Sequence, residues 1–305
     1  MRNKFAEVVH QQAKINRKIA VLVADISPAG AIVDFRKEFP ERFINTGVSE
    51  QSMIGIAAGM ALRGFKPFCY TIATFSLYRP FEMVRDDLGY QNLPVTVIGM
   101  GAGVIYSTLG ATHHTMEDIS IASAIPNMTV LAPCDPEEMK LATQWCANES
   151  TGPVYMRLGK AGEPDLTKNS VDPFKIGKIR YLRRGHNIAI LAYGNILDMA
   201  VKLADSIENQ NRTISVLSCH TLKPFDIAGV QQVLNDHDEV IVIEEHVPAG
   251  GLSSRVKEIA WNSQAKVRLS CFSLKDEFIH FYGDHSQLLS MHGLSVNQIK
   301  TALGY

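Results

Sequence analysis

The stretch that decides the fold prediction is IAVLVAD, residues 19–25. It is a continuous apolar run rather than an alternating one, as expected of a strand buried on both faces of a parallel sheet. Similar runs follow through the first half of the chain: RFINTG (42–47), PFCYTIA (67–73), VTVIGM (95–100), MTVLAP (128–133) and VYMRL (154–158). Amphipathic segments separate them, near residues 4–17, 50–63, 76–89, 117–124 and 135–148. This alternation predicts an α/β fold with a doubly wound, mostly parallel sheet.

The pattern is interrupted at residues 159–178, GKAGEPDLTKNSVDPFKIGK, which are rich in Gly, Pro, Asp and Lys and are typical of a linker. More strand-like runs follow it: NIAILAYG (187–194), TISVLSCH (213–220), EVIVIEEH (239–246) and VRLSCFS (267–273). We therefore predict two domains, over residues 1–175 and 180–305, of which the second is a smaller α/β domain.

The composition is that of an ordinary globular protein, with 46% hydrophobic and 20% charged residues among 305 and a formal net charge of -1. The charges are spread along the chain, which argues against nucleic-acid binding, and no run reaches the ~18 apolar residues of a membrane-spanning helix. The N-terminus lacks the apolar segment of a signal peptide. The five cysteines are scattered without a C-x-x-C pair, which indicates reduced thiols in a cytoplasmic protein and argues against zinc.

Chemically active residues follow several of the predicted strands. Ligands of an open α/β sheet bind at the carboxyl ends of its strands. Those positions hold Asp25, Glu50, Arg157 and the segments TFSLYRPF (74–81) and GAGVIYSTLGATHH (101–114). The sequence therefore predicts a binding site at this edge of the first sheet.

Two features of these segments have a purely structural alternative. Phe75, Tyr78 and Phe81 are spaced to form one aromatic face of a helix, which is more often core packing than a ligand-binding wall. His113 and His114 are adjacent and point apart on any regular backbone, which argues against a shared metal. A lone histidine is also commonly a partly buried, hydrogen-bonded side chain without a ligand.

Glu50 has a local alternative as well. It stands in front of a long apolar run, MIGIAAGMAL (53–62). A carboxylate in the first turn of a helix interacts favourably with the helix dipole, and Thr46 or Ser49 could cap that helix. Taken alone, this stretch favours the local role.

Together the segments resemble the C-terminal half of a transketolase-type thiamine diphosphate enzyme, and the resemblance covers nearly the whole chain. It rests on ADISPA, FINTGVSEQSMIGIAAGMAL, TFSLYRPFEMVRDD, GATHHTMEDISIASAIPNMTVLAPCDPEEM, GPVYMRLGK, HTLKPFD and EEHVPAGGLSSRVKEIA, in the family's order and near its spacing. It implies that residues 1–175 form the pyrimidine-binding domain and residues 180–305 the family's C-terminal domain. These motifs are specific for the family but not for a substrate.

The resemblance assigns the cofactor residues. Glu50 matches the family glutamate that hydrogen-bonds a ring nitrogen of the aminopyrimidine, where a carboxyl group favours the tautomer that can take up a proton. Phe75, Tyr78 and Phe81 match the wall that stacks on the aminopyrimidine, with Phe75 in direct contact. Asp25, at the end of the first strand, is a further predicted cofactor contact.

The half of the site that binds the diphosphate is missing. Thiamine diphosphate enzymes hold it through a divalent cation bound by a GDG…N segment, whereas this chain has YGDHSQ (282–287) and no GDG with an Asn at the family's spacing. We expect a split enzyme, in which an N-terminal transketolase-like partner subunit carries the diphosphate site and its Mg²⁺ or Ca²⁺, and this chain binds no metal. Two copies, associated through their pyrimidine-binding domains, would pair with two partners in an α2β2 heterotetramer.

The substrate end departs from the family pattern. His113 matches the histidine that contacts the donor ketose beside its carbonyl, which makes it, with Glu50, a predicted catalytic residue. Transketolases for sugar phosphates usually have Asp, His and Ser where this chain has Leu109, Gly101 and Ala29. The change removes a carboxylate that reads a hydroxyl group and two contacts to the sugar phosphate, so we expect a non-standard sugar.

Two arginines complete the predicted substrate site. Arg157 matches a phosphate-binding arginine and Arg2 a second one, unless the terminal residue is disordered.

The predicted function is transfer of a two-carbon ketol unit from a ketose to an aldehyde. The alternatives are a decarboxylating relative, such as a deoxyxylulose phosphate synthase or a 2-oxo acid dehydrogenase beta subunit, and a non-catalytic scaffold subunit. Retention of Glu50, Phe75 and His113 argues against the scaffold.

Overall fold

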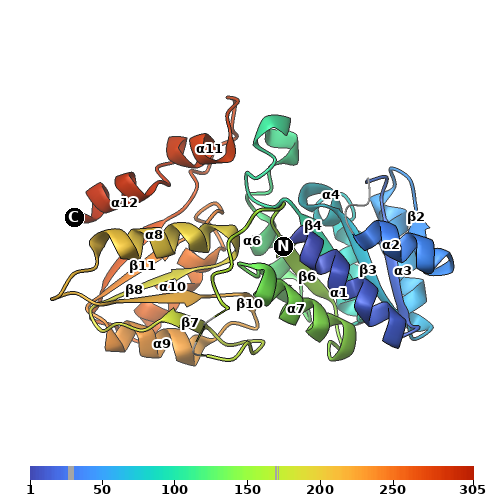
Figure 1. Cartoon of the computed structure of the whole chain (residues 1–305), viewed down its shortest axis with the longest axis horizontal. Helices are drawn as coiled ribbons and strands as arrows, with labels where there is room; N and C mark the ends of the chain where they lie inside the picture. Colours follow the sequence, from blue (N-terminus) through green and yellow to red (C-terminus); the bar gives the residue numbers. More distant parts are fainter. Residues whose placement is uncertain (27–30, 169, 171) are drawn as a thin grey trace.

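The computed structural model describes residues 1–26, 31–168, 170 and 172–305. Within these residues each half of the chain builds a sheet covered by helices, and the two halves lie side by side (Figure 1). The strands and helices alternate along the chain, and the predicted α/β class is confirmed.

The first sheet has the strand order β10-β5-β6-β4-β3-β1-β2 in the described part of the chain. Its strands from the first half are β1 (Ile19–Val23), β2 (Phe43–Asn45), β3 (Lys66–Ile72), β4 (Thr96–Met100), β5 (Thr129–Leu131) and β6 (Val154–Leu158). These six are parallel wherever they pair with one another. Strands β1, β4 and β6 are buried at every position, which explains why their sequences are continuously apolar.

Helices cover both faces of this sheet. One face packs against α1 (Arg2–Ile15), α2 (Ala31–Glu38) and α7 (Pro136–Asn148). The other packs against α3 (Glu50–Leu62) and α6 (Asp118–Ala124). Figure 1 shows α1 and α7 side by side on the first of these faces.

The second sheet has the order β12-β11-β8-β9-β7 in the residues that the structure describes. Its strands are β7 (Arg180–Arg183), β8 (Ile188–Ala192), β9 (Ile214–Ser218), β11 (Glu239–Ile243) and β12 (Arg268–Phe272). Its helices are α8 (Leu197–Ile207), α9 (Ile227–Asp236), α10 (Leu252–Asn262), α11 (His285–Met291) and α12 (Val296–Leu303). Only β7 runs antiparallel to its neighbour among these strands, so this domain is also mostly parallel.

The structure departs from the sequence-based prediction in several places: α2 and β7 were not predicted, and two further departures follow. The single helix expected at residues 76–89 is divided into α4 (Ala73–Leu77), α5 (Phe81–Met83) and a π-helical turn (Val84–Tyr90). Pro80 lies at the first break, where it has no N–H to continue the helical hydrogen bonds. The second departure is β10 (Thr221–Lys223), which was not predicted and pairs antiparallel with β5 of the first sheet.

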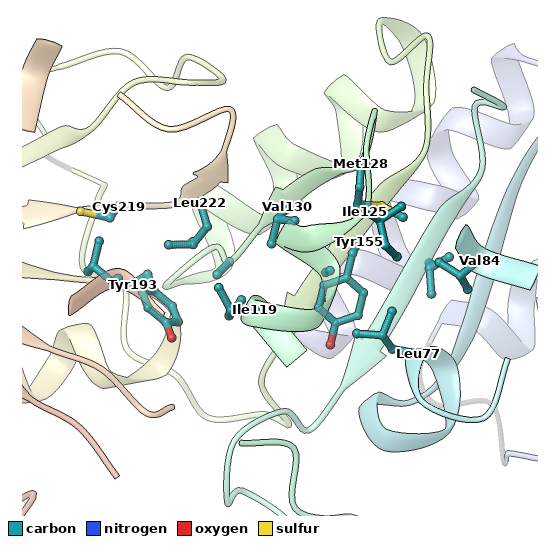
Figure 2. Close-up of a cluster of buried hydrophobic side chains, with 14 of the residues drawn as sticks. Leu77, Val84, Ile119, Ile125, Met128, Val130, Tyr155, Tyr193, Cys219 and Leu222 are labelled. Carbon is teal, nitrogen blue, oxygen red and sulfur yellow. The ribbon is translucent and has the colours of Figure 1, made fainter. Parts of the chain in front are cut away.

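The two halves also share one hydrophobic cluster. Figure 2 shows Tyr193, Cys219 and Leu222 from the second half beside Val130 and Ile119 from the first, and all belong to the same buried cluster. Beyond the side chains drawn there, the Lys223 ammonium donates a hydrogen bond to the Ser123 carbonyl at 2.8 Å. The junction between the halves is therefore packed like a domain interior.

The linker is anchored to the first domain by one carboxylate. Asp135 caps α7 by accepting a hydrogen bond from the Glu138 N–H at 2.8 Å. The same side chain accepts hydrogen bonds from the Leu166 and Thr167 N–H groups at 2.9 and 2.6 Å. Asp135 is fully buried, so it fixes the middle of the linker close to the end of β5.

All five cysteines lie in the described residues, and each is a free thiol. Burial raises the pKa of the four fully buried thiols, Cys69, Cys134, Cys146 and Cys219, which keeps them protonated and unreactive. Over the described ranges, no helix combines the length and the apolar character needed to cross a membrane.

Candidate functional site

The predicted edge of the first sheet gathers several of the predicted site residues. Strands β1, β3 and β4 are parallel neighbours, so their carboxyl ends meet at one edge. Helix α4 begins directly after β3, and the loop 101–114 begins directly after β4. Helix α3 begins at Glu50, five residues after the end of β2.

Glu50 is a buried carboxylate at the first position of α3, with 3% of its surface exposed. Its Oε1 accepts a hydrogen bond from Nη1 of Arg79 at 3.0 Å. The two candidate caps make other hydrogen bonds: the Ser49 hydroxyl donates to Ser52, and the Thr46 hydroxyl donates to the Val23 carbonyl. The local helix-capping interpretation therefore leaves the burial of Glu50 and its pairing with Arg79 unexplained.

Phe75 supplies the aromatic surface next to this carboxylate. The Arg79 guanidinium lies over the Phe75 ring, with its central carbon 4.0 Å from the ring centre. The His113 ring meets Phe75 edge-on, at 5.2 Å between ring centres. Glu50, Phe75, Arg79 and His113 therefore form one connected group, which we call the Glu50 group.

A pocket of about 400 Å³ opens beside the Glu50 group. The residues that line it include Phe75, Tyr78, Arg79, His114, Met116 and Glu117 from the first domain and Phe278 and Ile279 from the second. The Tyr78 hydroxyl donates a hydrogen bond to Glu117 at 2.9 Å, and burial, with the charge of Asp118, raises the pKa of Tyr78. Phe81 is half-buried and packs against the hydrophobic cluster shared by the two domains. Tyr78 packs against the same cluster, but unlike Phe75 and Tyr78, Phe81 does not line the pocket.

The two histidines have different surroundings. Nδ1 of His113 lies 3.0 Å from the Thr112 hydroxyl, and burial together with the charge of Arg79 lowers the pKa of His113. His114 is 5% exposed and lines the pocket, and burial lowers its pKa too. Both imidazoles are therefore neutral at neutral pH. His114 takes a larger part in the pocket wall than the sequence motifs indicated.

Leu109 and Gly101, two of the altered substrate positions, do not line the pocket beside the Glu50 group. Leu109 is 49% exposed, in a 3₁₀ turn of the loop. Gly101 has a left-handed backbone (φ +68°), and a Cβ there would collide with the ring of Tyr106. Ala29 lies outside the described residues.

Arg157 and Arg2 hold interior positions. Arg157 is 6% exposed, its Nε lies 3.2 Å from Asp118, and Nη2 donates to the Glu245 carbonyl at 2.8 Å. Its guanidinium is thus already engaged by the protein. Arg2 is the first residue of α1 and is half-buried, and its charge partly offsets the rise in pKa that burial causes in Tyr70 and Tyr106. Roles of Arg157 and Arg2 in substrate binding remain predictions.

Asp25 is exposed at the end of β1, in a left-handed conformation (φ 46°). Its N–H donates to the Asn45 side chain at 3.1 Å, and the same oxygen accepts from the Gly47 N–H at 3.0 Å. Asn45 therefore shapes the turn that leads towards Glu50. A cofactor contact from Asp25 remains a prediction.

Arg79 and Glu117 are charged pocket residues that the sequence analysis did not single out. Arg79 follows Phe75 by four residues, the spacing at which helical side chains meet, and this spacing could have revealed it. No group of three or more His, Cys, Asp or Glu side chains is placed to hold a metal ion within residues 1–26, 31–168, 170 and 172–305.

Comparison with known families covers both domains. Residues 1–162 match the family described as "Transketolase, pyrimidine binding domain", and residues 177–299 match "Transketolase, C-terminal domain". The chain belongs to the transketolase family.

Three relatives illustrate the match. One subunit of the apulose-4-phosphate transketolase of Phocaeicola vulgatus is 30% identical over 100% of this chain and 96% of its own length. The 1-deoxy-D-xylulose-5-phosphate synthase of Clostridium perfringens is 32% identical over 98% of this chain, which spans only 48% of that enzyme. The solved structure of a split-gene transketolase, described as an inactive β4 tetramer, matches 99% of this chain and 96% of its own with a TM-score of 0.87 and 31% identity.

Proposed function

We propose that this chain is the subunit of a two-component transketolase that binds the aminopyrimidine half of thiamine diphosphate and transfers a two-carbon ketol unit from a ketose to an aldehyde. The observation that carries the proposal is the pair formed by the buried Glu50 carboxylate and the Phe75 ring at the carboxyl edge of a parallel sheet. The family membership supports it.

The residues fit an aminopyrimidine ring. The position of Arg79 means that a flat, nitrogen-bearing group can lie over Phe75 and share a hydrogen bond with Glu50 at the same time. The adjoining pocket of about 400 Å³ gives such a group room to enter. Tyr78 lines the pocket with its hydroxyl held by Glu117, so it can serve as a second wall.

The roles of this chain's residues follow from their positions. Glu50 would hold a hydrogen bond to the ring from its buried position and Phe75 would stack on the ring, while neutral His113, with Nδ1 facing Thr112, would offer Nε2 to the donor ketose. The bound cofactor supplies the carbon that carries the transferred two-carbon unit. Burial of Glu50 keeps water from competing for its hydrogen bond.

We propose that an N-terminal transketolase-like subunit supplies the diphosphate and metal site. The full-length agreement with a protein named as one subunit of a transketolase supports a separate partner, and the split-gene structure described as an inactive β4 tetramer supports self-association without activity. Helix α3 begins with Glu50 and exposes Gly55, Ile56, Gly59 and Leu62. Such small and apolar surface suits an α2β2 assembly in which pyrimidine-binding domains meet.

Two further parts of the proposal concern organisation and location. We propose the domain bounds 1–175 and 180–305, which place β7 at the start of the second domain. We also propose a cytoplasmic location, which the buried free thiols support.

The substrate is proposed to be a non-standard sugar. Leu109 and Gly101 provide no charged side chain, and Arg157 is bound to Asp118. The relative named apulose-4-phosphate transketolase makes apulose 4-phosphate one candidate to assay. Anion binding would then depend on Arg2, on displacement of Arg157, or on the partner.

A decarboxylating reaction is the second candidate, because the synthase is as similar in sequence as the apulose-4-phosphate transketolase relative. The test is to mix this chain with its N-terminal partner, thiamine diphosphate and Mg²⁺, and to compare ketose donors with pyruvate. Ketol transfer to an aldehyde supports the proposal. Carbon dioxide release from pyruvate without ketol transfer would replace it with the synthase-like reaction.

A further inference from the structure

The Arg79 guanidinium lies in a defined place between two residues of the site. Nη1 donates to Oε1 of Glu50 at 3.0 Å, and the guanidinium carbon lies 4.0 Å from the centre of the Phe75 ring. The group is planar, and its N–H bonds point outward in its own plane. It therefore stacks on the ring face and reaches the carboxylate at once, an arrangement favoured by cation–π attraction and by a charge-assisted hydrogen bond.

An aminopyrimidine bound as proposed above would need the same ring face and the same carboxylate. Two groups cannot occupy that space together. Resting on the proposed function, we infer that Arg79 stands in for the cofactor ring in the free subunit and must leave when the ring binds.

The burial of the two partners determines which of them can give way. The Glu50 side chain is 4% exposed, whereas the Arg79 side chain is 44% exposed. A buried carboxylate without a partner is strongly disfavoured, so Glu50 needs either Arg79 or a replacement donor. Arg79 can rotate into water at little desolvation cost. The exchange therefore proceeds by movement of Arg79, while Glu50 stays in place.

The exchange has a consequence for affinity. A ring that binds must first displace Arg79, so the apparent dissociation constant equals the intrinsic one divided by the fraction of molecules in which Arg79 has left the site. This competition stabilises the free subunit without its partner and lowers its affinity for the cofactor ring. Removal of the guanidinium should tighten binding by about tenfold, the factor that corresponds to one partly exposed ion pair and its stacking.

The first experiment observes the displacement directly in the full wild-type chain. The probe is 4-amino-5-hydroxymethyl-2-methylpyrimidine, the ring portion of the cofactor. The Arg79 side-chain protons over the Phe75 ring should be shifted upfield in the NMR spectrum of the free protein. We expect saturation with the probe to return them to ordinary positions. Protons that stay shifted at saturation would overturn the inference.

The second experiment compares probe affinities by calorimetry for the wild type, Arg79→Met and Arg85→Met. Arg85 is a matched control because its side chain is 60% exposed and it pairs with Asp86 outside the site. We expect about tenfold tighter binding for Arg79→Met and no change for Arg85→Met. Equal or weaker binding by Arg79→Met, or no binding by any of the three, would overturn the inference. If Arg79→Met does not fold, the NMR measurement of Arg79 displacement in the wild type alone tests the inference.

The assay of ketol transfer with wild-type subunits separates this inference from the proposed function. Ketol transfer with an undisplaced Arg79 overturns only the stand-in role. Displacement of Arg79 without ketol transfer supports the stand-in role and overturns the proposed reaction.

Discussion

Two regions of the same sheet edge hold a buried charge in opposite ways. In the Glu50 group, a buried carboxylate pairs with Arg79, whose side chain is 44% exposed. In β6, Arg157 pairs with Asp118, and both side chains are at most 7% exposed. The first pair can exchange one member for a ligand, because that member can move into water. The second pair cannot do so without leaving a buried charge unpaired.

The exposure of the partner in each ion pair therefore separates ligand-binding residues from structural residues better than the residue type does. Arg157 lies at the end of a strand where an anion site is expected, yet Asp118 and the Glu245 carbonyl hold its guanidinium. Tyr155 donates a further hydrogen bond to Asp118 at 2.8 Å, which completes a buried network. We therefore expect the Glu50 group to respond to ligands and the Arg157–Asp118 pair to respond to changes in stability.

The largest expected effect comes from Glu50→Gln, which keeps the size of the side chain and replaces its carboxyl group with an amide that cannot transfer the proton. Turnover of the reconstituted enzyme should fall by roughly 100- to 10,000-fold, because proton transfer through this carboxyl group is lost. The fold and partner binding should persist in circular dichroism and size-exclusion chromatography. Glu82→Gln, at an exposed position of α5, is the control. Turnover close to wild type in Glu50→Gln would refute the mechanism.

Substrate choice tests the altered substrate positions. We expect xylulose 5-phosphate with ribose 5-phosphate to have a kcat/KM about 10- to 100-fold below that of the best branched, deoxy, sulfonated or carrier-linked sugar, because the usual polar contacts are replaced by Leu109 and Gly101. Leu109→Asp should narrow this gap, and its exposed position should make the change nearly neutral for stability. If the ordinary sugar pair is the best substrate, the inference from these positions fails.

Phe75→Ala should weaken binding of thiamine diphosphate to the reconstituted enzyme by about tenfold, through loss of the stacking surface. Calorimetric titration measures the affinity. Phe65→Ala is the control, since Phe65 is also half-buried but lies beside Lys18, away from the pocket. Equal losses in the two variants would indicate a general effect on stability rather than a cofactor contact.

The smallest expected effect is a change in the pKa of His113. Burial and the positive charge of Arg79 both lower the pKa of His113, so a proton binds there less readily than to the unfolded chain. This contribution makes the fold less stable as the pH falls below the ordinary histidine value. Arg79→Met should raise the pKa of His113 towards that value, as followed by NMR titration of the ring protons. Arg85→Met should leave it unchanged.

The sequence predicted those parts of the fold that depend on local patterns. Buried parallel strands such as β1 and β4 are marked by continuous apolar runs, and the first turn of α3 was placed at Glu50. Strand β10 is only Thr221–Lys223, and its pairing with β5 joins residues about 90 positions apart, so no local pattern marks it.

The site was predictable to a similar degree. Glu50, Phe75 and His113 were identified from motifs, and the structure places them in one group. Arg79 was missed because an arginine in a polar helical segment resembles ordinary surface charge. The engagement of Arg157 could not be foreseen, because its partner Asp118 is distant in the sequence and becomes a neighbour only through the fold.

Strand β10 has a consequence for how the molecule comes apart. It adds a strand from the second half to the first sheet, next to the shared cluster around Val130 and Leu222 (Figure 2). A protease that cut the linker at residues 159–178 would leave two fragments still joined by a β-ladder and a common core. Neither fragment alone would have a complete set of packing partners, because β5 would present a bare edge. The nicked protein should therefore unfold in one cooperative thermal transition, although the sequence pattern predicts two domains.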